Sequence, residues 1–507
     1  EPVGFFDIQY FFPECKDGFD VVIANPPYLG NKEIGSEKQK VYKERFGFTD
    51  DMYNYFYLLG FEILCDNGVI SYITSNTFLT LNSKLNLREL FQQNRIVELA
   101  TVGSVFEAYV NTAVTIIKKE NTAKNNYLFT MIDAKKDITK PQAYTIDINT
   151  YRNALNKIFF IPNDLNLSLY KNIYSKLNSI VQQYWSKIMS VNTMNRYRKE
   201  IKNYQESLAD SDLTILGLIC EGGQGLVTGN NSEYLANVCF THQQELKILQ
   251  QLSEKLEGHY SSFKHEVQLE NKKYFYDLAK EIKLKENNPS VLGRFFLYKS
   301  IKFDDIIYYS DLTESEKQNG RKKDAWVTYQ KGNKHGYKWI VPIEQCISWD
   351  NNTVYELKNA DGTNSRWQGS EYYDCTGFGW VDYFTKEIKA FYIEPSPYSK
   401  NVVKFHSKTE ISDKFITGLL NSKFITYYIK NFITNTHTLQ VNDGKLIPII
   451  YISKEKQKPI EDIVEEILSI KKTNLNADIS KLEEKVDYIV YNLYGLTKEE
   501  IAIIEDS

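Results

Sequence analysis

The sequence is poor in cysteine and histidine, with six of each among its 507 residues. The cysteines are scattered and form no Cys-x-x-Cys pair, which argues against a zinc site and against a disulfide framework. The histidines show neither His-x-His nor His-Glu-x-x-His spacing, so no metal-binding motif is present. Scattered thiols are typical of a reducing compartment, and we expect a cytoplasmic protein without a metal site.

Long apolar runs and a strong excess of charge are also missing. No run is long enough to cross a bilayer and no signal peptide is visible, so we expect no membrane partner. The formal net charge is −4 at pH 7, and any nucleic-acid surface must therefore be a local basic patch. The hydrophobic content of 42% fits globular domains with real cores, and the length predicts two to four domains.

Strand-like and helix-like segments alternate over residues 1–120. "FDVVIA" at 19–24 is a short apolar run rich in valine and isoleucine, as expected for a buried parallel strand. "DMYNYFYLLGFEILC" has helical spacing, and "VISYITSN" has the pattern of the next strand. This rhythm predicts an α/β fold with a doubly wound, Rossmann-like sheet, whose ligands bind at the carboxyl ends of the strands.

The rest of the chain changes character twice. Residues 121–212 have the pattern of a helical linker region. Residues 213–453 are strand-rich and aromatic, which predicts a mixed α+β domain, with a helical insert near 242–286. Residues 454–507 are predicted to form two amphipathic C-terminal helices.

Asn25-Pro26-Pro27-Tyr28 follows directly on the first apolar run. Two prolines end a strand because they have no N–H for the ladder. The Asn25 side-chain oxygen and the Pro26 carbonyl could accept hydrogen bonds from an exocyclic amine, which would localise its lone pair for attack on a methyl group. The prolines would hold these acceptors rigid, and Tyr28 could lie flat against a flipped base. The alternative is a turn that only ends the strand.

The motif resembles the catalytic motif of TaqI-like N6-adenine DNA methyltransferases, a group that includes the methylase parts of type IIG and BREX-type systems. "DDMYNYFYLLGFEILCDNGVISYITSNTFL" and "VGSVFEAYVNTAVTIIKK" resemble the segments that follow the motif in that family, and "EGGQGLVTGNNSEYL" resembles the start of its target-recognition domain. The resemblance implies S-adenosylmethionine as cofactor, double-stranded DNA as partner and a target-recognition domain at 213–453. It assigns catalysis to Asn25–Tyr28 and a second base-stacking ring to Phe106, and it makes Asp7 a candidate cofactor contact.

The sequence departs from this family in its cofactor loop. The family carries a glycine-rich loop upstream of the motif, but the 24 residues before Asn25 contain none. A downstream candidate, "LGLICEGGQGLVTGNN", lacks a clear following helix. We therefore expect an N-terminally truncated chain that relies on a missing segment or a partner subunit to bind the cofactor.

Two other functions stay open at this point. One is a DNA-binding specificity module without activity of its own. The other is a protein glutamine N5-methyltransferase, because Asn-Pro-Pro-Tyr also occurs in such enzymes.

A basic and aromatic segment, "GRKKDAWVTYQKGNKHGYKW", spans Gly320 to Trp339. Basic side chains suit phosphates, and aromatic or polar ones suit bases and sugars. The alternative to a DNA-binding segment is a solvated, lysine-rich hairpin without a ligand. The candidate DNA contacts are Arg321, Lys322, Lys323, Lys331, Lys334 and Lys338.

Overall fold

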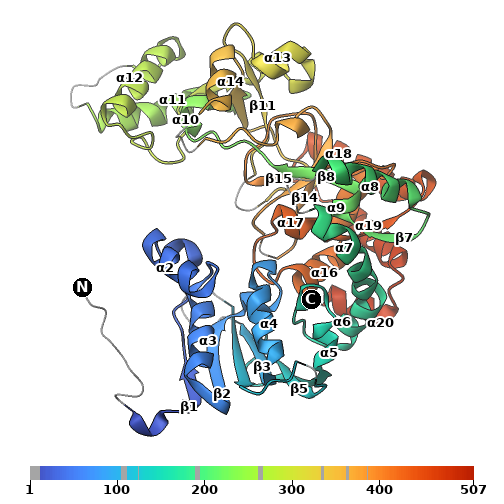
Figure 1. Ribbon diagram of the computed structural model, residues 1–507. Coiled ribbons are helices and arrows are strands. Elements are labelled where there is room, and N and C mark those ends of the chain that lie inside the picture. The colour runs from blue at the N-terminus through green and yellow to red at the C-terminus, as the bar shows by residue number, and fades with distance from the viewer. Residues whose placement is uncertain are drawn as a thin grey trace. The chain divides into compact units, whose positions relative to one another are not determined.

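The computed structural model (Figure 1) describes residues 12–103, 111–123, 125–188, 194–260, 266–332, 336–360, 365–384 and 386–506; at 185–188 and 194–198 only the backbone is described. The chain divides into two units. The first comprises Glu1–Arg198, Tyr427–Thr436 and Ala502–Ser507, and the second comprises Lys199–Thr426 and His437–Ile501. Two short segments from late in the sequence thus complete the first unit.

The first unit is built on a six-stranded sheet with the order β1-β2-β4-β3-β5-β6. β1 pairs with β2, and β3 with β5, in parallel, whereas β4 is antiparallel to both of its neighbours and β6 to β5. The predicted α/β class is confirmed, and the sheet is mixed. β3 and β4 are antiparallel because the connection between them is shorter than the dozen or so residues that a parallel crossover needs. The strands are β1 (Phe19–Ala24), β2 (Leu64–Ser75), β3 (Arg95–Gly103), β4 (Thr112–Lys118), β5 (Leu128–Asp133) and β6 (Gln142–Asp147).

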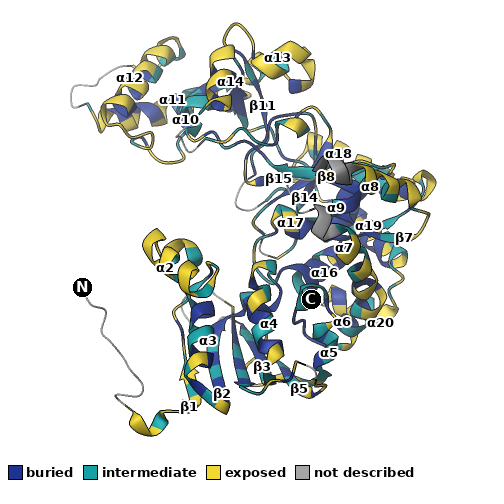
Figure 2. Cartoon of the chain, in the orientation of Figure 1, coloured by how far each residue is buried: buried dark blue, intermediate teal, exposed yellow. Residues whose placement is uncertain are grey.

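Helix α3 (Met52–Ile63) connects β1 to β2 and packs against the sheet. The hydroxyl group of Tyr57 lies 2.7 Å from that of Thr115 on β4, and its ring lies against that of Tyr72 on β2. Gly60 allows this close approach, because a Cβ there would lie 2.4 Å from the Tyr72 hydroxyl oxygen. Helix α2, by contrast, buries none of its residues (Figure 2). The other helices of this unit are α2 (Ser36–Phe46), α4 (Leu85–Gln93), α5 (Ile148–Arg152), α6 (Asp164–Leu169) and α7 (Ser175–Ile188).

Strand β1 is parallel to β2 as predicted, but the expected burial is wrong, because β1 lies at one end of the sheet and leaves apolar side chains in solvent. Val21 is 56% exposed and Ile23 is 76% exposed. No other described strand pairs with the outer edge of β1. Unpaired edges with β-branched residues readily accept another strand.

The second unit contains three sheets, with the strand orders β10-β9-β12-β11, β14-β13-β15-β8 and β16-β7. One hydrophobic core joins the two larger sheets, since Val327 and Ile347 of the first cluster with Phe391 and Val402 of the second. The strands are β7 (Asp212–Ile215), β8 (Cys220–Gln224), β9 (Leu235–Cys239), β10 (Ser300–Lys302), β11 (Trp326–Tyr329), β12 (Gln345–Ser348), β13 (Gly377–Val381), β14 (Ala390–Ile393), β15 (Val402–Ser407) and β16 (Pro448–Tyr451).

The predicted helical insert is confirmed as α11 (His242–Glu257) and α12 (Lys272–Lys285), which share a core of their own. The C-terminal stretch differs from the expectation of two helices, because it forms three: α18 (Lys454–Thr473), α19 (Ser480–Leu493) and α20 (Lys498–Glu505). Gly495, at a φ of 66°, ends α19 in the left-handed conformation that favours glycine. The remaining helices are α8 (Met194–Ser207), α9 (Leu216–Ile219), α10 (Asn231–Tyr234), α13 (Glu314–Asn319), α14 (Asn351–Lys358), α15 (Asp413–Leu420), α16 (Lys423–Tyr428) and α17 (Val441–Gly444).

None of the described helices has the length and apolar composition of a membrane-spanning segment.

Candidate functional site

The Asn25–Tyr28 motif lies where the chain leaves the sheet. Ala24, the last residue of β1, pairs with Tyr72 of β2, and the backbone is irregular from Asn25 onward. Pro26 is buried, whereas Asn25 and Pro27 are exposed. The motif therefore places an accessible amide side chain at the carboxyl end of a parallel strand, where ligands of α/β sheets bind.

Tyr28 is anchored to the neighbouring strand. Its hydroxyl group donates a hydrogen bond to the carbonyl oxygen of Ile73 on β2, at 3.4 Å. Partial burial raises the pKa of Tyr28 above that of an ordinary phenol. The ring is thus held near the ends of β1 and β2.

A buried ion-pair network fixes the loop after the motif. The Asp51 carboxylate accepts the backbone N–H of Asn31 at 2.9 Å, and the N–H of Met52 donates to the Leu29 carbonyl at 2.9 Å. Lys84, whose side chain is only 3% exposed, forms ion pairs with both Asp50 and Asp51. Sequence reasoning missed these residues. The adjacent acids before α3 were a visible signal, but their distant partner Lys84 was not.

Three predicted site residues cannot be placed, because Asp7, Phe106 and Lys334 lie outside the described residues.

The other basic candidates do not form one surface. The Arg321 guanidinium pairs with Glu316 at 2.9 Å. Lys338 pairs with Glu387 at 3.1 Å and with Glu483 at 2.8 Å, and although burial opposes it, these carboxylates raise the pKa of Lys338. Among the predicted contacts, these two cations therefore already have anionic partners within the protein.

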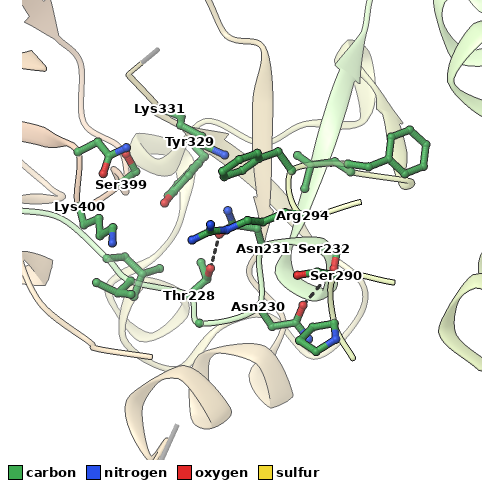
Figure 3. Close-up of a pocket in the computed structure, with 18 of the residues that line it drawn as sticks. Thr228, Asn230, Asn231, Ser232, Ser290, Arg294, Tyr329, Lys331, Ser399 and Lys400 are labelled. Carbon is green, nitrogen blue, oxygen red and sulfur yellow. Dashed lines mark hydrogen bonds between the residues drawn. The ribbon is translucent and has the colours of Figure 1, made fainter. Parts of the chain in front are cut away.

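The remaining three candidates line two separate clefts of the second unit. Lys322 and Lys323 border a cleft of about 630 Å³, whose lining also includes acids such as Asp324 and Asp350. Lys331 borders a cleft of about 490 Å³ (Figure 3). The cations of this second cleft are Arg294, Lys331, Arg366 and Lys400. Sequence reasoning found only Lys331, because the other three stand alone in the sequence.

No group of three or more metal-ligating side chains gathers in the part of the chain that the structure describes.

The motif lies at the carboxyl edge of an α/β sheet, and comparison with known proteins indicates which proteins share this region. Residues 3–106 match the family described as Eco57I restriction-modification methylase. The predicted resemblance to restriction-modification methylases is confirmed at this level.

Two curated relatives agree with that match. The chain is 27% identical over 183 residues to the Type II methyltransferase M.AccI of Acinetobacter calcoaceticus, a match that covers 34% of this chain and 33% of the relative. It is 22% identical over 183 residues to the adenine-specific methyltransferase BrxX of Escherichia coli O9:H4 (strain HS), covering 34% of this chain and 14% of the relative. The chain thus spans a third or less of these relatives.

Among solved structures, the chain is similar to the Type IIL restriction-modification enzyme MmeI in complex with DNA. The TM-score is 0.48 and the sequence identity 12%, over 96% of this chain and 56% of that one.

Proposed function

We propose that this chain belongs to a TaqI-like DNA adenine-N6 methyltransferase of the type IIG or BREX-type group, acting in restriction-modification or phage defence. In this proposal the first unit carries the catalytic motif, and the second unit is the target-recognition domain that binds double-stranded DNA. The observation that carries the proposal is an Asn-Pro-Pro-Tyr motif at the carboxyl end of β1, within the region that matches a restriction-modification methylase family.

The proposed chemistry depends on two acceptors at the end of β1. The target adenine is flipped out of the duplex, because its amine cannot be reached within the stack. The Asn25 side-chain oxygen and the Pro26 carbonyl then accept hydrogen bonds from the amine and leave its lone pair directed outward. Pro26 and Pro27 fix these acceptors before the base arrives, and the Tyr28 ring, tied to β2 by its hydroxyl group, stacks on the base.

S-adenosylmethionine is the proposed methyl donor, since the relatives are methyltransferases. The glycine-rich segment around Gly222 and Gly225 does not offer it a cradle. A Cβ at Gly222 would lie 2.0 Å from the Lys404 carbonyl oxygen, and one at Gly225 would lie 2.0 Å from the Tyr398 carbonyl oxygen. Protein backbone fills the space, so these glycines serve packing.

We therefore propose that residues outside the described part, with Asp7 as a candidate, or a partner chain hold the cofactor. The open edge of β1 supports this. A strand added there would pair with the unpaired backbone groups of β1 and would cover Val21 and Ile23 in part. The end of the added strand would then lie beside Asn25.

The test compares Asn25→Ala with Asn172→Ala, the same substitution at an exposed position of the first unit. Each variant is expressed in its natural genetic context in a host without adenine methylation, and N6-methyladenine in digested DNA is measured by mass spectrometry. We expect Asn25→Ala to lower the methylation rate by about 10²–10³, the typical effect of losing one preorganised hydrogen-bonding group. Near-wild-type methylation by Asn25→Ala would refute the assignment, and methylated glutamine in protein without methylated DNA would favour the glutamine enzyme.

A second candidate is a DNA-binding specificity module without activity of its own. The filled space around Gly222 and Gly225 favours it, because neither glycine leaves room there for the cofactor. Calorimetric titration of residues 1–507 with S-adenosylmethionine separates the two candidates, since tight binding by this chain alone would exclude the inactive module.

A further inference from the structure

The cleft shown in Figure 3 gathers cationic side chains that are far apart in the sequence. Arg294, Lys331, Arg366 and Lys400 all line it, and its lining contains no aspartate or glutamate. None of the four forms an ion pair within the part of the chain that the structure describes. The Asp382 carboxylate, outside the lining, interacts electrostatically with Lys400 but does not form an ion pair with it. Four like charges around one cleft repel one another, so the cleft is suited to an anion.

Backbone hydrogen bonds connect the segments that carry Arg366, Lys400 and Lys331. Arg366 and Val227 exchange two backbone hydrogen bonds, at 2.8 and 3.1 Å. The N–H of Lys400 donates to the Leu226 carbonyl at 3.1 Å, and the N–H of Ser399 donates to the Gln330 carbonyl at 2.9 Å. The backbone of these segments is therefore positioned without a ligand.

Buried polar groups in the cleft point to the same conclusion. Ser399 is 6% exposed, and its hydroxyl oxygen has no hydrogen-bond partner among the described residues. A buried hydroxyl group without a partner is unfavourable unless a ligand completes it. The Lys331 ammonium is also largely desolvated, and this burial lowers its pKa.

Two asparagine side chains add hydrogen-bond donors to the lining. The side-chain oxygen of Asn231 accepts from the Thr228 hydroxyl, and that of Asn230 accepts from Ser232 at 3.0 Å. Within the described residues neither amide NH₂ group donates a hydrogen bond, so both are available to a ligand. A lining rich in donors and free of carboxylates matches an anion with several oxygen acceptors.

We propose that this cleft binds successive phosphodiester groups of one strand of a DNA duplex, and so fixes the register of the second unit on its target. Four cations exceed the charge of a single phosphate ion, whereas a strand presents one negative charge at each phosphate. The inference rests on the proposed function in taking DNA as the polyanion, and it adds the residues that hold the backbone.

The test measures binding of a fluorescein-labelled DNA duplex of mixed sequence to the whole chain by anisotropy. The variant is Arg294→Gln/Arg366→Gln/Lys400→Gln, in which all three side chains are exposed in the wild type. The control is Lys472→Gln/Lys481→Gln/Lys485→Gln, which removes the same charge from exposed positions of α18 and α19.

We expect the slope of log K against log salt to shrink by about 0.9 for each lost phosphate contact. The loss of affinity between about 50 and 200 mM salt should then be about 40-fold smaller for the cleft variant than for the wild type. The control should keep the wild-type slope. Ser399→Ala should also weaken binding without lowering the melting temperature, which a purely structural hydroxyl group would not do.

Several results would overturn the proposal: a wild-type slope in the cleft variant, an equal change in the control, displacement of the duplex by millimolar inorganic phosphate, or no binding of DNA by the wild-type chain. If the triple variant fails to fold, the three single variants are read in the same way. A smaller salt slope in the cleft variant together with full methylation by Asn25→Ala would support phosphate binding by the cleft and refute the catalytic assignment of Asn25. An unchanged slope together with inactive Asn25→Ala would do the opposite.

Discussion

Replacing Lys84 by methionine tests whether the buried network holds the loop after Asn25–Tyr28. The Lys84 ammonium lies between the carboxylates of Asp50 and Asp51, and methionine would keep most of the side-chain volume while removing the charge. Breaking a buried ion pair on one side typically lowers stability by about 3–5 kcal/mol, because a charge is left without its partner. Asp51 is 29% exposed and can be hydrated in part, so we expect the lower end, about 3 kcal/mol.

Hydrogen exchange, measured by mass spectrometry on peptides from α3 and from residues 25–33, reports the local loss of stability directly. About 3 kcal/mol corresponds to exchange that is roughly a hundredfold faster. Arg45→Met is the matched control, because Arg45 pairs with Glu62 at 2.7 Å but both side chains are more than half exposed. Removing such an exposed pair should change stability by less than about 1 kcal/mol. Adding Asp50→Asn to Lys84→Met should restore part of the protection, and unchanged exchange in Lys84→Met would refute the reasoning.

Two further predictions concern acidity and stacking. Burial raises the pKa of Asp443 to about 6, against about 4 in an unfolded chain. Between about pH 4 and about pH 6 the folded protein therefore binds a proton that the unfolded chain does not. The free energy of unfolding should fall by up to about 3 kcal/mol as the pH rises through this range. Asp443→Asn should remove that pH dependence in urea unfolding followed by tryptophan fluorescence, and equal slopes in both proteins would contradict the burial argument. Tyr28→Ala should raise the KM for DNA about fivefold to 150-fold, from a stacking energy of about 1–3 kcal/mol. Tyr28→Phe keeps the ring and loses only the 3.4 Å hydrogen bond to Ile73, so its effect should be much smaller. Equal effects of the two substitutions would argue against stacking.

The parts of the fold that could be predicted are those that local sequence determines. "FDVVIA" predicts a strand at 19–24, and the prolines that follow indicate where it ends, but the expected burial of β1 is wrong because no residue of the strand is buried. The helical insert is marked by its own apolar spacing, and α11 and α12 indeed share a separate core. The C-terminal run was harder to divide, because the apolar pattern continues across Gly495 and only its left-handed backbone separates α19 from α20.

The charge environment could not be predicted, because it depends on partners that are distant in the sequence. Lys331 and Lys338 look equivalent in the segment from Gly320 to Trp339. In the structure Lys338 is neutralised by Glu387 and Glu483, whereas Lys331 faces a cleft with no carboxylate in its lining. A count of basic residues in a segment therefore says little about which of them is available to a phosphate.

The architecture explains how such a cleft can vary while the fold persists. Leu226, Tyr329 and Tyr398 belong to the core that joins the two larger sheets, and each lies one or two residues before a polar residue of the cleft. The core residues and the backbone bridges between their segments set the positions of the lining. Arg366 and Lys400 are exposed, so their charged groups do not pack in the core. Substitution of these groups changes what the cleft contacts without disturbing the core. If the cleft contacts phosphates as proposed, such substitutions would change the strength of backbone contact and not the sequence that is read. The Asn25–Tyr28 motif, which depends on a buried proline and a neighbouring strand, would stay as it is.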